Sequence, residues 1–149
     1  MTHFFAITSL VTLFLMSTVA PATAQDTKEV SGYPVFSDYQ EFRDTLDPLI
    51  KSRQVSQFMK LFGGRHNYNQ AQSDDLQAKI RSVRPVDFIN VEVIKSDIVS
   101  DNWHQELLAY WTGADYLFVY ILYQQRDEGL FPISLNFNTD VKEILRFMM

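Results

Sequence analysis

The sequence predicts an α+β domain, in which N-terminal helices pack on a curved, cone-like antiparallel sheet of four strands and a short helix ends the chain. Up to Pro85, apolar residues recur at the spacing of amphipathic helices. After Pro85 the apolar period changes to two, in segments rich in β-branched and aromatic residues. The connections between these segments are short, and short connections join antiparallel strands. Helices and strands that are segregated along a chain indicate the α+β class.

The beginning of the chain predicts an export signal, residues 1–24. A continuous apolar stretch from Phe4 to Val19 leads into a small-x-small motif that ends at Ala24, and the segment contains no Asp or Glu. The stretch is shorter than the about 20 apolar residues that a membrane-spanning helix needs. We expect cleavage between Ala24 and Gln25, and therefore a secreted protein, periplasmic or extracellular, with no membrane segment after cleavage.

The mature chain is expected to form one domain, residues 37–149, after a polar and flexible tether at residues 25–36. Its net charge of -5 argues against nucleic acid and anionic membrane surfaces as partners, because both require clustered positive charge. The lack of cysteine excludes disulfides, thiolate nucleophiles and Cys-ligated zinc. We find no phosphate-binding glycine loop and no Ser/His/Asp motif, and no cofactor is expected.

Two helices are expected before the glycine pair at residues 63–64. Ser37, with Gln40 three residues later, is a capping-box pattern for a first helix at residues 38–46. Proline is favoured at the first position of a helix, so we expect a kink or a restart at Pro48 and a second helix over residues 48–62. Glycine suits the C-terminal cap of that second helix.

A third helix is expected from Ser73, its N-cap, to Arg84, where Pro85 stops it. Its expected buried stripe is Leu76, Ile80 and Val83. A last helix is expected over Val141–Phe147, capped at residues 139–140.

Four strands are expected after the third helix. They are Val86–Lys95, Trp103–Trp111, Asp115–Gln125 and Leu130–Phe137. The expected turns between them are residues 100–102, 112–113 and 126–129.

The register of the last hairpin has two alternatives. Leu130 pairs either with Gln124 or with Gln125. The first register sets Leu135 opposite Val119, and the second sets it opposite Tyr120; a slip of one residue exchanges the faces of the strand. The residues of the last strand that are expected to face the core are Phe131, Ile133, Leu135 and Phe137, because polar residues alternate with them.

The segment Asp115–Gln125 is apolar on both of its faces. One face carries Leu117, Val119 and Ile121, and the other carries Tyr116, Phe118, Tyr120 and Leu122. A strand of this kind must be covered on both sides. Helices cover one side. Either the terminal helix or a second subunit, packed sheet to sheet, covers the other; the second alternative predicts a homodimer.

The segment from Asp115 to Phe147 combines a long apolar strand, YLFVYILYQQ, the charged turn RDEG, the strand LFPISLNFN and a terminal helix. With the helices before it, this layout resembles the nuclear transport factor two-like (cystatin-like) superfamily. The resemblance covers the whole mature chain and rests on element order and hairpin lengths. It implies an antiparallel sheet curled around N-terminal helices into a cone. Because members include isomerases, dehydratases, cyclases and domains without catalysis, it implies no single function.

Aromatic side chains on the expected strands are candidates for a pocket that takes a small apolar ligand. These ligand-binding candidates are Tyr110, Trp111, Tyr116, Phe118 and Tyr120, and Trp103 belongs to the same group. Ordinary packing in a core or an interface also accounts for them, because aromatic residues dominate such surfaces.

Catalysis inside a cone requires an ionisable group at an inward strand position, where desolvation moves its pKa toward the working pH. The ionisable residues on the expected strands are Asp87, Glu92, His104, Glu106 and Asp115. Asp87 and Glu92 are expected on opposite faces of one strand, so at most one points inward. His104 and Glu106 share a face, either as a base with its orienting partner or as a solvated pair at the edge of the sheet. No residue is assigned a catalytic role.

The loop after the second expected helix offers a weak anion-binding hypothesis. Its residues Gly64, Arg65 and His66 provide backbone amides and a guanidinium, although a glycine stop followed by a solvated loop is the simpler interpretation. His66 and His104 are the histidines that remain after cleavage. They lie in separate segments without ligand spacing, so no metal site is expected.

Two classes of function remain. The leading hypothesis is a non-catalytic module that binds a protein partner or a small apolar ligand. The alternative is a small-molecule isomerase or lyase that acts in the cone. An open cavity that holds His104 or a carboxylate favours the enzyme. A cavity filled by apolar side chains such as Phe58, Leu76 and Phe118 rules out catalysis inside it and is compatible with a binding module. A third possibility is an accessory of envelope assembly.

Overall fold

The computed structural model describes residues 28–30, 33–62, 70–83 and 85–148. The expected signal peptide at residues 1–24 and the anion-binding loop with Gly64, Arg65 and His66 lie outside the described residues. The helices are α1 (Tyr39–Lys51), α2 (Val55–Lys60), α3 (Gln70–Val83) and α4 (Val141–Leu145). The strands are β1 (Lys28–Val30), β2 (Tyr33–Val35), β3 (Asn90–Ser100), β4 (Trp103–Thr112), β5 (Asp115–Arg126) and β6 (Gly129–Asn138).

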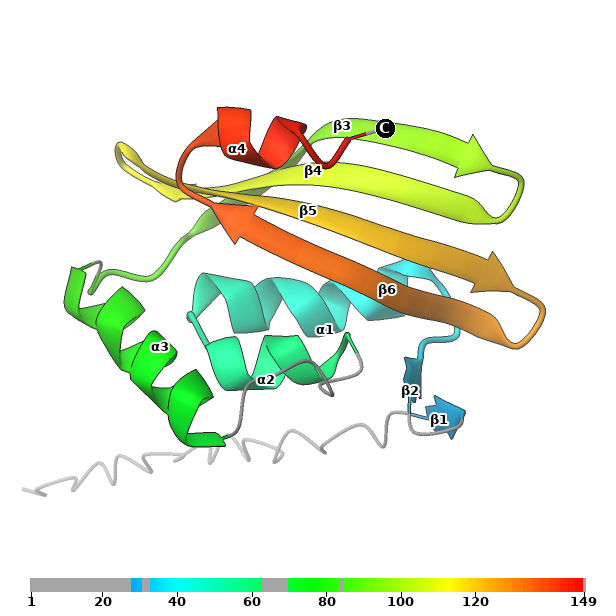
Figure 1. Ribbon diagram of the computed structural model, residues 1–149, viewed down its shortest axis with the longest axis horizontal. Coiled ribbons are helices and arrows are strands. Elements are labelled where there is room, and N and C mark those ends of the chain that lie inside the picture. The colour runs from blue at the N-terminus through cyan, green and yellow to red at the C-terminus, as the bar shows by residue number, and fades with distance from the viewer. Residues whose placement is uncertain (1–27, 31–32, 63–69, 84, 149) are drawn as a thin grey trace, which may run out of the picture.

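The expected α+β class, the four-stranded antiparallel sheet and the short C-terminal helix are confirmed. The strands follow one another in space as in sequence, in the order β3-β4-β5-β6. In Figure 1 the sheet forms one layer, with α1 and α2 on one side and α4 on the other. Within the described residues, no helix combines the length and the apolar character needed to cross a bilayer.

The first strand of the sheet begins and ends later than the predicted Val86–Lys95. The backbone N–H of Phe88 donates to the carbonyl of Lys51 at 3.0 Å, which ties this residue to the end of α1. Contact with β4 begins at Ile89, whose N–H donates to the carbonyl of Trp111 at 3.2 Å. At the other end, β3 extends to Ser100 because it pairs with β4 as far as Trp103. The polar turn at residues 101–102 therefore sets the end of the strand.

The first helix continues through Pro48 and does not restart there. The N-cap is Asp38, whose side chain accepts a hydrogen bond from the backbone N–H of Glu41 at 2.8 Å, so the expected cap at Ser37 is wrong by one residue. Helix α1 then runs to Lys51 with Pro48 inside it. A proline in this position removes one backbone hydrogen bond, a loss that tertiary packing of the helix overrides.

The break between the first two helices lies at Arg53. Its backbone φ is +55°, its N–H donates to the carbonyl of Ile50 at 3.0 Å, and the N–H of Gln54 donates to Leu49 at 2.8 Å. These two bonds form a Schellman motif, a helix end that usually carries glycine in place of Arg53. The second helix consequently begins at Val55 and not at Pro48.

The third helix is less buried than its sequence predicts. It begins at Gln70, before the expected cap Ser73, and none of its described side chains is fully buried. Leu76 and Ile80 pack against the core, but Val83 is 77% exposed. The expected stripe is therefore correct for its first two members only.

Within the expected tether at residues 25–36, the described residues form a strand pair and place two side chains in the core. β1 and β2 form an antiparallel pair, and Val35 and Phe36 are buried. Phe36 exchanges two backbone hydrogen bonds with Leu130 of β6, of 3.0 and 2.8 Å. The polar sequence before Tyr33 concealed this because the contact is made by two apolar residues at the end of the segment.

The last hairpin follows neither predicted register throughout. Gln125 pairs with Leu130, as in the second alternative, but a bulge in β6 then shifts the pairing, and Leu135 lies opposite Ile121. The bulge places Ile133 at the surface, 39% exposed. Leu135 and Phe137 pack against the core as predicted, whereas the prediction that Ile133 faces the core is wrong.

Two hydrophobic clusters lie on the two faces of the sheet. The larger one joins α1 and α2 to the inner face, which includes Leu108, Tyr110, Val119, Ile121 and Tyr123. The smaller one joins Ile144 of α4 to Leu107 and Tyr120 on the outer face. Two alternatives were expected to cover the outer face, the terminal helix or a second subunit. In this structure the terminal helix α4 lies on it.

Candidate functional site

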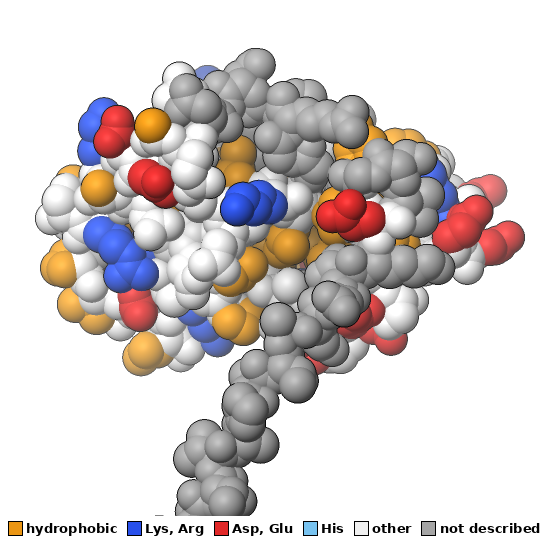
Figure 2. Space-filling view, turned by 90° about the horizontal axis from the view of Figure 1, so that it is seen from below, with side chains coloured by type: hydrophobic (Ala, Val, Ile, Leu, Met, Phe, Trp, Pro, Cys, Tyr) orange, Lys and Arg blue, Asp and Glu red, His pale blue; other side chains and the backbone are white. Residues whose placement is uncertain are grey.

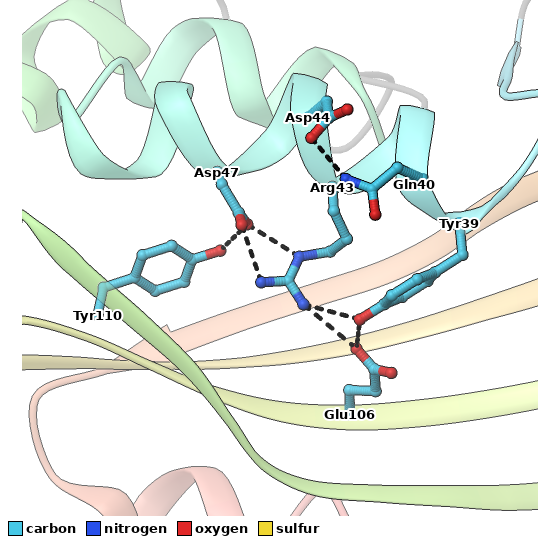
Figure 3. A network of polar contacts seen from close by, with 7 residues as sticks. All are labelled: Tyr39, Gln40, Arg43, Asp44, Asp47, Glu106 and Tyr110. Carbon is cyan, nitrogen blue, oxygen red and sulfur yellow. Dashed lines mark hydrogen bonds and ion pairs between the residues drawn. The ribbon is translucent and has the colours of Figure 1, made fainter.

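The polar centre of the inner face is Arg43 of α1 (Figure 3). Its guanidinium forms two hydrogen bonds with the carboxylate of Asp47, each 2.9 Å long, and donates from Nη1 to the hydroxyl of Tyr39 at 2.7 Å. Arg43 and Asp47 stand one helical turn apart, which suits a bidentate pair on one helix face. Nη1 also lies 3.8 Å from Oε2 of Glu106, so this cation faces two carboxylates.

The network ties the first helix to the sheet. Tyr110 of β4 donates its hydroxyl proton to Asp47 at 2.7 Å, and Tyr39 of α1 donates to Glu106 of β4 at 2.7 Å. Ser96 of β3 adds a hydrogen bond to the second oxygen of Glu106 at 3.2 Å. Both carboxylates are thus fixed by side chains from a facing element, and the group as a whole holds α1 in one register above β4.

Burial raises the pKa of Tyr39 to about 12, and its hydrogen bond to Glu106 adds to the rise. Burial also raises the pKa of Tyr110, reinforced by the charge of Asp47, and that of Tyr123, reinforced by Glu106. For Arg43, burial lowers the pKa, but the hydrogen bond and charge of Asp47 outweigh burial, so that the pKa is raised. At neutral pH the phenols are therefore protonated and Arg43 is charged, a state suited to holding structure and not to proton transfer.

We expect the stability of the protein to fall as the pH rises from about 10 to about 12. Tyrosine in the unfolded chain ionises near pH 10, whereas Tyr39 in the folded chain stays neutral up to about 12. A raised folded pKa gives stability that is complete below the unfolded pKa and is lost as the pH rises through the folded one. Urea unfolding across this range measures the loss. Tyr39→Phe should show a weaker dependence on pH, and an unchanged dependence in that variant would contradict the assignment.

A separate cavity of about 400 Å³ lies at the other end of α1, among α2, α3 and the sheet. Its described walls are mostly apolar, and they include Val55, Phe58, Ile80, Phe88, Leu117 and Phe137. Phe58 and Phe137 meet edge to face, with ring centroids 5.7 Å apart. On the face in Figure 2, hydrophobic side chains reach the surface between charged ones. The size and the apolar walls are those of a small-molecule site.

The structure does not bring the five aromatic ligand-binding candidates into one pocket. Tyr110 is buried on the inner face, bonded to Asp47. Trp111, Tyr116 and Phe118 form a row of stacked rings on the outer face, with successive centroids 6.2 and 5.9 Å apart. Tyr120 stacks on Phe147, just after α4. None of the five is among the described residues that line the cavity.

The ionisable candidates separate in the same way. Asp87 precedes β3, so the prediction that Asp87 and Glu92 lie on one strand is wrong. Both side chains are exposed, and Asp87 contacts Arg53. Asp115 is exposed at the start of β5. Within the described part of the chain, no group of three His, Asp or Glu side chains is placed to hold a metal ion.

His104 and Glu106 share the inner face, but they are not a solvated edge pair. Glu106 is 5% exposed within the network around Arg43. His104 stacks on Tyr123, with ring centroids 5.1 Å apart. The structure thus separates their surroundings: the carboxylate belongs to the polar network, and the imidazole lies against an aromatic ring.

Sequence reasoning missed Arg43, Asp47 and Arg53. The first two stand four residues apart in α1, a spacing that marks an ion pair on a helix. That spacing was concealed because Pro48 was taken as the start of a new helix. Arg53 gave no signal, because its buried position depends on the helix end that it forms and on Phe88 from a distant segment.

No protein-family model, curated protein or solved structure matches this chain. The resemblance to the nuclear transport factor two-like superfamily therefore stays a prediction.

Proposed function

We propose that this chain is an exported, non-catalytic module that binds a small apolar ligand in the cavity among α2, α3 and the sheet. The observation that supports this most directly is the cavity itself, of about 400 Å³ with walls that are mainly aliphatic and aromatic. Ligand sites of this size bury most of a small apolar molecule and gain affinity from the apolar area removed from water.

A catalytic role in this cavity has less support. Among the described residues that line it, none is His, Asp or Glu. The best acid–base candidate, Glu106, lies elsewhere and accepts hydrogen bonds from Tyr39 and Ser96. Acid–base catalysis would favour a carboxylate or an imidazole beside the bound substrate, whereas the ionisable side chains on the described walls are the cations Arg53 and Lys79. The isomerase or lyase alternative therefore ranks second.

The cone-like curvature of the sheet and export of the mature chain are parts of this proposal. A ligand cavity between helices and an antiparallel sheet fits the fold that the sequence resemblance implies. The apolar stretch from Phe4 to Val19 supports export. The N-terminal sequence of the protein recovered from its native host tests this part, and a mature chain that still begins at Met1 would contradict it.

A homodimer through the outer face of the sheet also stays a proposal. Helix α4 covers Leu107 and Tyr120, but Tyr116 on the same face is 42% exposed. A second copy that packs against the stacked row of Trp111, Tyr116 and Phe118 would bury these rings. Sedimentation equilibrium of the mature chain tests this, and a monomeric mass at every accessible concentration would contradict it.

We expect the mature protein to bind N-phenylnaphthylamine, a neutral apolar dye, in a saturable manner. Ile80→Trp should raise the dissociation constant of the dye at least about tenfold, because the larger side chain occupies cavity space. The matched control is Val99→Trp, the same new side chain at an exposed position on β3. Dye fluorescence measures the dissociation constants. Equal affinities of the two variants, or no saturable binding by the wild type, would contradict the proposal.

A further inference from the structure

The described charged residues that line the cavity are both positive. They are Arg53, which follows α1, and Lys79 of α3. The chain as a whole has 13 Lys and Arg against 18 Asp and Glu. The described walls therefore carry two cations and no carboxylate, whereas the sequence as a whole has more acidic than basic residues. A positive potential in an apolar cavity favours a ligand that carries a negative charge.

Arg53 is held against the wall of the cavity by its surroundings. Its side chain is 2% exposed, and its guanidinium carbon lies 4.3 Å from the centroid of the Phe88 ring. Nη1 is 3.5 Å from the carboxylate of Asp87, which is itself exposed to solvent. A guanidinium has five N–H donors, so an arginine that contacts one exposed carboxylate and an aromatic face can also attract the carboxylate of a ligand.

The backbone at Arg53 gives a second reason to look for a role of its side chain. Its φ of +55° is the left-handed conformation that favours glycine at this point of a Schellman motif. An arginine here carries conformational strain that a glycine would avoid. Residues held in strained backbone conformations cluster at active sites, ligand clamps and switch regions.

Lys79 and two neutral polar residues complete the polar part of the lining. Lys79 is exposed, so that its ammonium belongs to the rim of the cavity. Asn138 and Thr139, at the end of β6, also line it. The side-chain amide of Asn138 and the hydroxyl of Thr139 can both donate hydrogen bonds to a carboxylate. The lining therefore offers apolar walls and a set of donors to one ligand.

We propose that the cavity takes an amphipathic carboxylate of the fatty-acid class. The apolar tail lies among Phe58, Phe88 and Phe137, and the carboxylate meets Arg53 and Lys79. This inference rests on the ligand-binding function proposed above and adds the charge of the ligand to it.

The test compares decanoate with decanol, which has the same tail without the negative charge, as competitors of the bound neutral dye. Decanoate should displace the dye at a concentration about tenfold lower than decanol, and added salt should narrow the difference. Arg53→Gly, which suits the local backbone, should reduce the ratio of the half-displacement concentrations of decanol and decanoate from about ten to about one. Lys142→Met on α4 is the remote control that removes the same charge.

The outcomes separate the two proposals. Equal displacement by decanoate and decanol in the wild type would overturn the carboxylate inference and leave the apolar-ligand function intact. If neither decanoate nor decanol displaces the dye, both the apolar-ligand function and the carboxylate inference are contradicted. Lys79→Met changes an exposed residue, so it keeps the charge test valid if Arg53→Gly does not fold. An unchanged preference for decanoate in Lys79→Met and in folded Arg53→Gly would also overturn the inference.

Discussion

Replacing Arg43 with methionine is expected to lower the free energy of unfolding by about 3 kcal/mol or more. The change keeps an unbranched side chain of similar reach but removes the cation that faces Asp47 and Glu106. Each carboxylate would keep a tyrosine partner and lose its charge partner in a largely buried place. Removing one member of a buried ion pair costs more than the pair contributes, because the other charge is left uncompensated. Urea unfolding followed by tryptophan fluorescence measures the change.

The matched control is Arg146→Met, which breaks an exposed pair with Glu143. Exposed pairs contribute at most about 1 kcal/mol, so this variant should stay close to the wild type. The double variant Arg43→Met, Asp47→Asn should lose less stability than the sum of its single changes, because the two side chains interact directly. Equal losses in Arg43→Met and Arg146→Met would show that the network does not hold α1 on the sheet.

Strands β4, β5 and β6 were the part of the fold best predicted from sequence. They begin and end within one residue of the predicted ranges, because an apolar period of two bounded by polar turns has few other interpretations. The bulge in β6 could not be predicted in this way. It inserts one residue without changing composition, and it reverses which side chains face the core on its two sides.

Helix boundaries were harder to predict because local signals compete with tertiary contacts. Pro48 carries a strong local signal for a helix start, yet α1 continues through it, with buried Leu46 and Ile50 on either side. The helix ends instead at Lys51, and the chain turns at Arg53, a residue type that rarely takes the left-handed conformation. The burial of Arg53 and its contact with Phe88 come from the folded chain and leave no mark on the local pattern.

The candidate site was also hard to predict, because it depends on which face of the sheet each side chain lies on and on contacts between distant segments. Aromatic residues were correctly recognised as abundant on the strands, but alternation of side chains divides them between the two faces, with Tyr110 inside and Trp111 outside. The cavity is built from the ends of elements that are far apart in sequence, such as Val55, Phe88 and Phe137. A single sequence that contains no recognisable motif does not predict that these residues line one cavity.

Replacing Gly129 with alanine is expected to lower the free energy of unfolding by about 3 kcal/mol. Gly129 has a φ of +135°, which L side chains rarely adopt, and a Cβ built on it meets the backbone carbonyl of Phe36. Backbone does not move aside as a side-chain tip does, so the segment before α1 must shift. Its two hydrogen bonds between Phe36 and Leu130 would weaken with it. The strain alone costs about 1–3 kcal/mol, and each hydrogen bond about 1.

Gly113→Ala separates the contact with Phe36 from the effect of backbone conformation. Gly113 also has a positive φ, of +56°, but a Cβ there has no neighbour within 4 Å. This variant should lose only about 1 kcal/mol, since it carries strain without a clash. The difference in urea midpoint between the two variants measures how firmly residues 33–36 are attached to β6. Equal losses would mean that this segment is the tether that its polar sequence suggests, because a mobile Phe36 would make room for the new methyl group.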